Sequence, residues 1–358
     1  MPRYPRTCAR FIFVAVNTHR KTILPESKFE RFPVSIPKQS DVADFSHHVR
    51  RFPSRTTLFS VKTLGLGAVV SMLAFSASAE PVVSTSDVER FYAIYDTADG
   101  KPTAEQLQRD YLDQGTDGLK HFASIRKITG ERIAKAINDR PEIYVRAREC
   151  VAALPAAKAR VGSALNRFSE LYSEAQFPPV TISVGRGRPV AVAGPNDGIN
   201  IGLEALCATT FINPNVEDRL VRVMVHEFIH VQQNPELTDK ENPTVLDLSV
   251  VEGSAEFVTE LLTGDVAYAY MANLVKGREL EIETKFQTDM ASTDLSNWLY
   301  NSTATNPQDL GYWVGYRISK AYYSNAKDKR KALQELITMR DARTILASSG
   351  WRPGVEIE

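Results

Sequence analysis

Residues 213–233 read NPNVEDRLVRVMVHEFIHVQQ, and this stretch decides the fold and the chemistry expected of the chain. A helix is predicted to begin near Asn213 and to stop before Pro235. Glu217 and Asp218 fall in its first turn, where acidic side chains suit the helix dipole. Apolar side chains recur along one face, which predicts that this face is buried. They are Leu220, Val221, Met224, Phe228 and Val231.

Two histidines lie four residues apart in the sequence His226-Glu227-Phe228-Ile229-His230. On a helix their imidazoles project from adjacent turns of one face and can reach a single ion at about 2.0–2.1 Å. The carboxylate of Glu227 then lies near the ion without binding it and can accept a proton from an activated water. The pattern predicts a site for one zinc ion. The same motif also arises by chance, with both histidines as core or surface residues.

A second helix is predicted over residues 244–262, and it offers two acids, Glu252 and Glu256. A catalytic zinc ion takes three protein ligands and leaves one position open, so either acid can complete the site. They lie one turn apart on the same face, and spacing alone does not choose between them. Gly253 and Ala255 are small, which would let this helix pack closely against the histidine-bearing helix. This favours Glu252 as the third ligand.

The rest of the chain predicts an α+β fold that is mostly helical, with a small sheet beside the histidine-bearing helix. The pattern is helical over residues 87–176. The stretch Ile199 to Leu203 is expected to be an edge strand along which a substrate backbone can lie. We therefore distinguish a helical N-terminal region, 80–176, from a catalytic region, 177–358, which together can form one compact unit. Further strands are expected at 180–184 and 189–192, and later helices at 311–323 and 331–340.

Charge is distributed unevenly along the sequence. Residues 1–60 carry eleven Lys and Arg against four Asp and Glu, so the part from Glu80 onward is acidic, with a net charge of −8. An acidic body without a basic stripe argues against nucleic acid or an anionic membrane as the main partner. A peptide or protein substrate is the expected partner.

Residues 61–79 have the pattern of a secretory signal peptide. Lys62 precedes a short apolar run, and Ser76-Ala77-Ser78-Ala79 has the small-residue pattern of a cleavage site. About a dozen apolar residues are too few to span a bilayer comfortably, so no stable membrane anchor is expected after cleavage. The protein is therefore expected in the periplasm or the medium. Residues 1–60 would be a non-native or disordered extension, with an organelle transit segment as the rival interpretation.

Cys150 and Cys207 are the two cysteines that follow the expected cleavage site. In an oxidising compartment they can form a disulfide. Two buried free thiols, which pack as small hydrophobic groups, are the equally weighted alternative.

The motifs resemble a known group of proteins. His226-Glu227-x-x-His230, followed by Glu252-Gly253-Ser254-Ala255, is similar to the arrangement of the gluzincin metalloproteases, whose third ligand is a glutamate on a following helix. More closely, residues from Phe91 to Trp351 resemble a bacterial family of predicted zinc-dependent proteases related to gliding-motility lipoprotein B. Its further landmarks appear here as Tyr111-Leu112-x-x-Gly115-x-x-Gly118-Leu119, Trp298-Leu299-Tyr300-Asn301 and Asp309-Leu310-Gly311-Tyr312-Trp313-Val314-Gly315-Tyr316.

The resemblance implies a zincin-like fold and roles for individual residues. Glu252 would be the third metal ligand, and Glu256 would orient a ligating histidine. Tyr312, within a Tyr-x-x-Gly pattern, would donate to the oxyanion, with Tyr316 as the alternative donor. The segment that aminopeptidases of this clan use to bind a free amino terminus has no counterpart in residues 180–225.

These observations favour a zinc peptidase in which Glu227 acts as general base on a water that the ion activates. Two alternatives share the same residues. One is a zinc-stabilised binding module of the cell envelope with little or no hydrolytic activity, and the other is a zinc hydrolase of a non-peptide amide.

Overall fold

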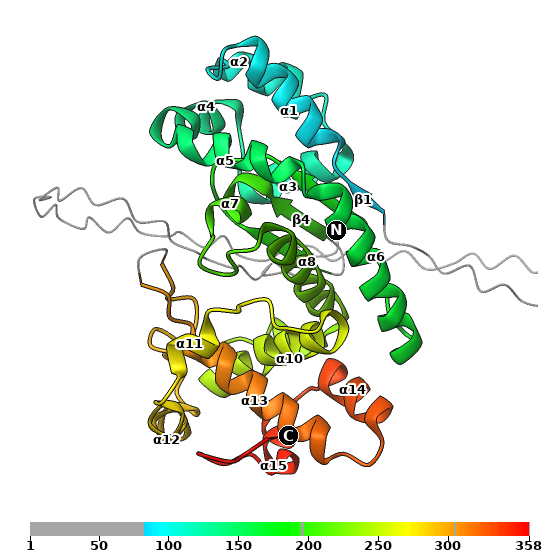
Figure 1. Ribbon diagram of the computed structural model, residues 1–358, viewed down its shortest axis with the longest axis vertical. Coiled ribbons are helices and arrows are strands. Elements are labelled where there is room, and N and C mark those ends of the chain that lie inside the picture. Colours follow the sequence, from blue (N-terminus) through cyan, green and yellow to red (C-terminus); the bar gives the residue numbers. More distant parts are fainter. Residues whose placement is uncertain (1–81, 195–196, 304–305, 358) are drawn as a thin grey trace, which may run out of the picture. The chain divides into compact units, whose positions relative to one another are not determined.

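The computed structural model describes residues 82–194, 197–303 and 306–357 of the 358-residue chain. The expected extension over 1–60 and the expected signal peptide over 61–79 lie outside these residues. Most of the described chain is helical, and four strands form one small sheet, so the expected mostly helical α+β composition is confirmed (Figure 1). Among the described helices, none is both long enough and apolar enough to cross a membrane.

The helices lie in two stretches of the sequence, one between β1 and β2 and one after β4. Before β2 these are α1 (Ser86–Thr97), α2 (Ala104–Gln106), the π-helix η1 (Leu107–Leu112), α3 (Asp117–Arg126), α4 (Gly130–Asp139), α5 (Pro141–Val151) and α6 (Leu154–Leu171). After β4 these are α7 (Leu203–Ala208), α8 (Val216–Gln232), α9 (Pro235–Thr238), α10 (Val245–Thr263), α11 (Met271–Val275), α12 (Glu279–Asp289), α13 (Leu310–Asn325), α14 (Lys329–Thr338) and α15 (Ala342–Ser349).

The sheet has the strand order β1-β2-β4-β3. Its strands are β1 (Val83–Ser84), β2 (Val180–Ser183), β3 (Ala191–Gly194) and β4 (Gly198–Gly202). β2 pairs in parallel with both β1 and β4, whereas β3 pairs with β4 in the antiparallel sense. β1, which the sequence analysis did not predict, brings the N-terminal region into the same sheet as the catalytic region.

The expectation that residues 199–203 form an edge strand is wrong. β4 lies between β2 and β3, and Leu203 already belongs to α7. The chain turns back at Gly198, whose φ of 64° suits glycine, and β4 then inserts between the two strands that precede it in sequence. A local pattern does not specify on which side a returning strand pairs. The edge strand of this part of the sheet is β3.

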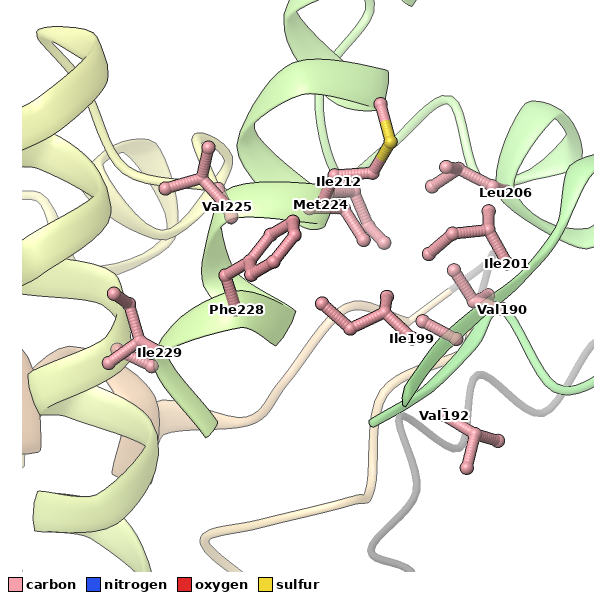
Figure 2. Close-up of a cluster of buried hydrophobic side chains, with 14 of the residues drawn as sticks. Val190, Val192, Ile199, Ile201, Leu206, Ile212, Met224, Val225, Phe228 and Ile229 are labelled. Carbon is pink, nitrogen blue, oxygen red and sulfur yellow. The ribbon is translucent and has the colours of Figure 1, made fainter. Parts of the chain in front are cut away.

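α8 packs against the sheet through apolar side chains. Figure 2 shows Ile199 and Ile201 of β4 opposite Phe228 and Met224 of α8, and all four are at most 1% exposed. The five residues expected to form the apolar face of this helix are all buried. Ile229, on another side of α8, is also buried, because α10 packs there. The Asn215 side chain accepts from the backbone N–H of Asp218 and caps the helix.

α10 begins and ends near the predicted positions. Thr244 and Asp247 form a reciprocal capping box, and Gly264, with a φ of 89°, ends the helix. The expected role of Gly253 in approaching α8 is wrong, because a Cβ at this position would overlap the backbone of Gly315 on α13. The small residue thus permits the close α10–α13 contact instead.

A disulfide joins Cys150, in α5, to Cys207, in α7, with 6.4 Å between their Cα atoms. Of the two alternatives for these cysteines, a disulfide or two buried free thiols, the structure shows the disulfide. Together with the β1–β2 pairing, it connects the N-terminal region to the catalytic region. One continuous cluster of buried apolar side chains also runs through both regions.

Candidate metal centre

Two helices supply the candidate metal ligands. His226 and His230 project from α8, and their Nε2 atoms lie 2.9 Å apart. Oε2 of Glu252, on α10, lies 3.4 Å from Nε2 of His226 and 3.1 Å from Nε2 of His230. Because the three ligand atoms all lie within 4.8 Å of one another, they form a group that could hold a metal ion. The structure thus brings together the three residues that the sequence proposed as ligands.

The second ring nitrogen of each histidine faces a side-chain oxygen. Nδ1 of His226 lies 2.8 Å from Oε1 of Glu256, and Nδ1 of His230 lies 2.8 Å from Oε1 of Gln233. An acceptor at Nδ1 favours the tautomer with its proton there and leaves the Nε2 lone pair free. Both Nε2 lone pairs then point toward one position beside Glu252, where they repel each other unless a cation lies between them. The residues therefore fit a metal ion.

Gln233 is a site residue that the sequence analysis missed. Its Nε2 donates to the main-chain oxygen of Val251 and to Oγ of Ser254, at 2.7 and 2.9 Å. Both partners belong to α10, so they orient the amide with its oxygen toward His230. Gln233 follows His230 by three residues and caps the end of α8 in an extended conformation, so its short interval from His230 was the available signal.

The acids control the charge of this site. Burial alone would lower the pKa of His226, but hydrogen bonds and charge interactions with Glu252 and Glu256 raise it to about 10. Burial alone would raise the pKa of Glu252, yet the charge of His230 and hydrogen bonds with both histidines hold it well below its usual range. Glu252 is therefore a carboxylate at neutral pH, and the site favours positive charge, which either protons or a metal ion can supply.

Glu227 lies between the two histidines in sequence and is 3% exposed. Its Oε1 atom is buried without a hydrogen-bond partner among the described residues. Burial raises the pKa of Glu227, and the charges of His230 and His226 lower it in part. A carboxyl group with a raised pKa and an unsatisfied oxygen is suited to take up and release a proton.

Three tyrosines, Tyr312, Tyr268 and Tyr300, lie beside the candidate ligands. The Tyr312 ring stacks on the ring of His226 at 6.3 Å between centroids, and the Tyr268 ring lies 5.9 Å from His226 and 4.9 Å from Tyr312. Burial, and then the negative charge of Glu252, raises the pKa of Tyr312 well above its usual value, so its hydroxyl keeps its proton. Tyr268 was not expected at the site, and its hydroxyl is buried without a hydrogen-bond partner in the described part of the chain.

Tyr316, the alternative oxyanion donor, belongs to a different network. Its hydroxyl donates to Oε2 of Glu260 at 2.9 Å and accepts from Nζ of Lys320 at 3.0 Å. Glu260 lies two helical turns beyond Glu252 on α10. The structure therefore brings Tyr312, and not Tyr316, next to the metal-ligand group.

Tyr300 binds the candidate ligand Glu252 directly. Its hydroxyl donates to Oε1 of Glu252 at 2.8 Å, which leaves Oε2 directed at the histidines. Tyr300 precedes α13 in a loop, and its φ of 58° lies in the left-handed region. The segment Trp298-Leu299-Tyr300-Asn301 was noted as a landmark, but no spacing rule connects a loop residue to a helix 48 positions away.

Two imidazoles and one carboxylate are a donor set that catalytic zinc ions use, and the side chain of His230 is 17% exposed. Residues 201–347, from β4 to α15, match the family described as "Predicted Zn-dependent protease (DUF2268)". The expected relation to a family of predicted zinc-dependent proteases is confirmed for this region, which contains every candidate ligand. The comparisons with curated proteins and with solved structures found no match.

Proposed function

We propose that this protein is a single-zinc peptidase of the gluzincin type with a zincin-like catalytic region. One observation carries the proposal. His226, His230 and Glu252 converge through one atom each, and Glu227, the residue after the first histidine, has a buried Oε1 without a hydrogen-bond partner among the described residues. The family match to residues 201–347 supports a zinc-dependent protease.

A bound zinc ion would supply a Lewis acid that polarises the scissile carbonyl and acidifies the attacking water. His226, His230 and Glu252 would hold it. Glu227 accepts the proton of the water as its oxygen bonds to the carbonyl carbon, and returns it to the amine when the carbon–nitrogen bond breaks. Tyr312 donates a hydrogen bond to the oxyanion, since its raised pKa keeps the hydroxyl protonated. No covalent bond between enzyme and substrate forms.

The edge strand β3 is the proposed binding site for the substrate backbone. The backbone N–H of Gly202 donates to the carbonyl of Val190, and antiparallel pairs alternate, so Val192 also faces β4. The backbone groups of Ala191 and Ala193 therefore point away from β4. Ala191 is buried and Ala193 is partly exposed, so a peptide can add as a further strand at the Ala193 end of β3. β3 packs on α8, the helix that carries the catalytic motif.

Export is part of the proposal. The Cys150–Cys207 disulfide supports it, because disulfides persist in oxidising compartments and are rare in reducing ones. N-terminal sequencing of the natural protein should find Glu80 as the first residue in the periplasm or medium. Full-length protein in the cytosol would overturn this part of the proposal.

The zinc-stabilised binding module remains the second candidate, because the same site can serve stability alone. The deciding experiment is peptide-library cleavage by the purified protein with parallel metal analysis. Cleavage that a chelator abolishes and zinc restores supports the peptidase. Zinc-dependent folding without cleavage of any peptide would favour the module, and cleavage of non-peptide amides alone would identify a different hydrolase.

A further inference from the structure

Tyr268 lies in the irregular segment between α10 and α11, and its backbone is tied to the metal centre. The backbone N–H of Tyr268 donates to Oε2 of Glu256 at 3.2 Å. Oε1 of the same carboxylate lies 2.8 Å from Nδ1 of His226. One carboxylate of α10 therefore holds both a candidate ligand and the backbone of Tyr268, and this contact leaves the side chain of Tyr268 free for another role.

The ring of Tyr268 lies beside the ring of Tyr312. The two centroids are 4.9 Å apart, while the centroid of His226 lies 5.9 Å from Tyr268 and 6.3 Å from Tyr312. Because the two tyrosine rings are closer to each other than either is to His226, both lie on the same side of the imidazole. Aromatic rings at these separations are in contact. Tyr268 therefore belongs to the same wall of the metal centre as the proposed oxyanion donor.

The hydroxyl of Tyr268 is a buried donor without an acceptor. Tyr268 is 1% exposed, and its hydroxyl has no hydrogen-bond partner among the described residues. Burial, and then the negative charges of Asp309 and Glu252, raises the pKa of Tyr268 well above its usual value, so the hydroxyl keeps its proton. Buried polar groups in folded proteins nearly always have a partner, and one that lacks it destabilises the fold. The described chain thus holds a donor whose acceptor has to come from elsewhere.

The neighbouring Tyr270 shows the usual arrangement. Its hydroxyl donates to the main-chain oxygen of Gln308 at 3.0 Å and lies 3.0 Å from Oγ of Ser302. Serine and threonine hydroxyls can rotate toward the carbonyl of the preceding helical turn, whereas a tyrosine hydroxyl is fixed at the far end of its ring. The missing partner of Tyr268 therefore cannot be replaced by a small rotation toward its own backbone.

We infer that Tyr268 is a second oxyanion donor, whose hydroxyl bonds to an oxygen atom bound in the metal centre beside the bond from Tyr312. The hydroxyl is closed to bulk solvent, so its acceptor has to enter through the metal centre, where the side chain of His230 is 17% exposed. A carbonyl oxygen that gains negative charge during the reaction is the acceptor that such a donor stabilises most. Tyr268 transfers no proton and forms no covalent bond. This inference rests on the proposed function and adds a residue to it.

The first test is kinetic and compares two neighbouring tyrosines. Tyr268→Phe keeps the ring and removes only the hydroxyl, so it should lower kcat by about 10² with little change in KM. Tyr270→Phe is the matched control, because it removes a hydroxyl that already has acceptors in the protein. It should keep the kcat of the wild type. Metal analysis should find the same zinc content in both variants as in the wild type.

Two further measurements do not depend on turnover. Acetohydroxamate, a small anion that binds metals through its oxygen atoms, is titrated into the cobalt-substituted proteins and followed by visible absorption. Tyr268→Phe should weaken its binding by roughly tenfold, as expected for the loss of one hydrogen bond to a charged group, and Tyr270→Phe should not. Thermal unfolding should show the reverse order. Tyr268→Phe removes a buried donor that lacks an acceptor and should unfold at the same or a higher temperature than the wild type, whereas Tyr270→Phe loses a satisfied hydroxyl and should unfold at a lower one.

The outcomes separate this inference from the proposed function. If Tyr268→Phe keeps both the kcat and the hydroxamate affinity of a wild type that cleaves peptides, the inference is overturned and the peptidase stands. A lower unfolding temperature in Tyr268→Phe would also overturn it, because the hydroxyl would then have a structural partner such as a bound water. If the wild type binds hydroxamate but cleaves no peptide, the peptidase is refuted, and a loss of affinity in Tyr268→Phe would still assign the hydroxyl to the metal centre. A wild type that binds no metal would overturn both.

Discussion

The helix pair α8 and α10 and the loop before α13 contribute to the same centre in different ways. On the helices, an interval of four residues places His226 and His230 on one face of α8. The same interval places Glu252 and Glu256 on one face of α10. The loop contributes Tyr300, whose hydroxyl contacts Glu252 from a left-handed backbone conformation. Regular structure thus places the ligands, whereas irregular structure orients one of them.

The loop needs its own support for this conformation. A non-glycine residue at positive φ costs roughly 1–3 kcal/mol and persists only where its surroundings enforce it. Here the backbone N–H of Asn301 donates to Oδ1 of Asp309, and the backbone N–H of Asp309 donates to Oδ1 of Asn301, each at 2.8 Å. The backbone N–H of Gly311 also donates to the main-chain oxygen of Trp298 at 2.8 Å. These bonds fix Tyr300 against α10.

If the helices supply the reacting groups and the loop only orients a ligand, the largest loss of activity should follow substitution of Glu227, the general base on α8. Glu227→Gln should lower kcat by about 10²–10⁴, since general acid–base catalysis contributes this much, and should keep its zinc. The checks are steady-state kinetics on a cleaved library peptide and metal analysis. Wild-type turnover in this variant would refute the assigned base.

Tyr312, at the start of α13, is the next test. Tyr312→Phe should lower kcat by about 10² and change KM little, because an oxyanion donor acts mainly in the transition state. Tyr316→Phe is the matched control, since it removes a hydroxyl from the same helix that is bonded to Glu260. An equal or larger loss in the control would transfer the role to Tyr316. If neither variant shows this loss of kcat, the buried hydroxyl of Tyr268 becomes the remaining candidate oxyanion donor.

The contrast between helices and loop also explains what the sequence could predict. The intervals 226–230 and 252–256 have a fixed meaning on a helix, so the two histidines and a pair of candidate acids could be proposed from residue types and spacing. The choice of Glu252 over Glu256 needed the resemblance to the gluzincins, because the expected packing of Gly253 against α8 was wrong. Gln233 had a similar spacing and was overlooked. Capping residues such as Thr244 and Gly264 made the bounds of α10 predictable.

Tertiary pairing was not predictable from local patterns. β1 has two residues and pairs with β2 almost a hundred positions later, so no periodicity marks it. β4 pairs on both sides and β3 is the edge strand, because the side taken by a returning strand depends on contacts outside the turn. The contacts of Tyr300 and Tyr268 with the site likewise depend on how the later elements pack against α10.

The two acids of α10 separate binding from orientation within the helix pair. Glu252→Ala removes a ligand atom and should largely empty the site. Glu256→Ala leaves all three ligands and removes the carboxylate that lies near Nδ1 of His226 and accepts from the backbone N–H of Tyr268, so zinc affinity or activity should fall by about 10–100-fold. Zinc content and competition with a chelator measure both. Stoichiometric, tightly held zinc in Glu252→Ala would refute the ligand assignment.

The smallest effect is expected in the loop, where Tyr300→Phe removes one hydrogen bond to Oε1 of Glu252 and leaves the ring in place. Without this donor the carboxylate can rotate, and the affinity for zinc should fall by about tenfold, the lower end of losses for a partner that orients a ligand. Tyr322→Phe is the matched control, because it also removes a hydroxyl that donates to a glutamate, Glu335, but on other elements. It should leave the zinc affinity unchanged. If Tyr300→Phe loses as much zinc affinity as Glu252→Ala, the loop does more than orient a ligand. If the wild type, Tyr300→Phe and Tyr322→Phe bind zinc with equal affinity, the helices hold Glu252 unaided.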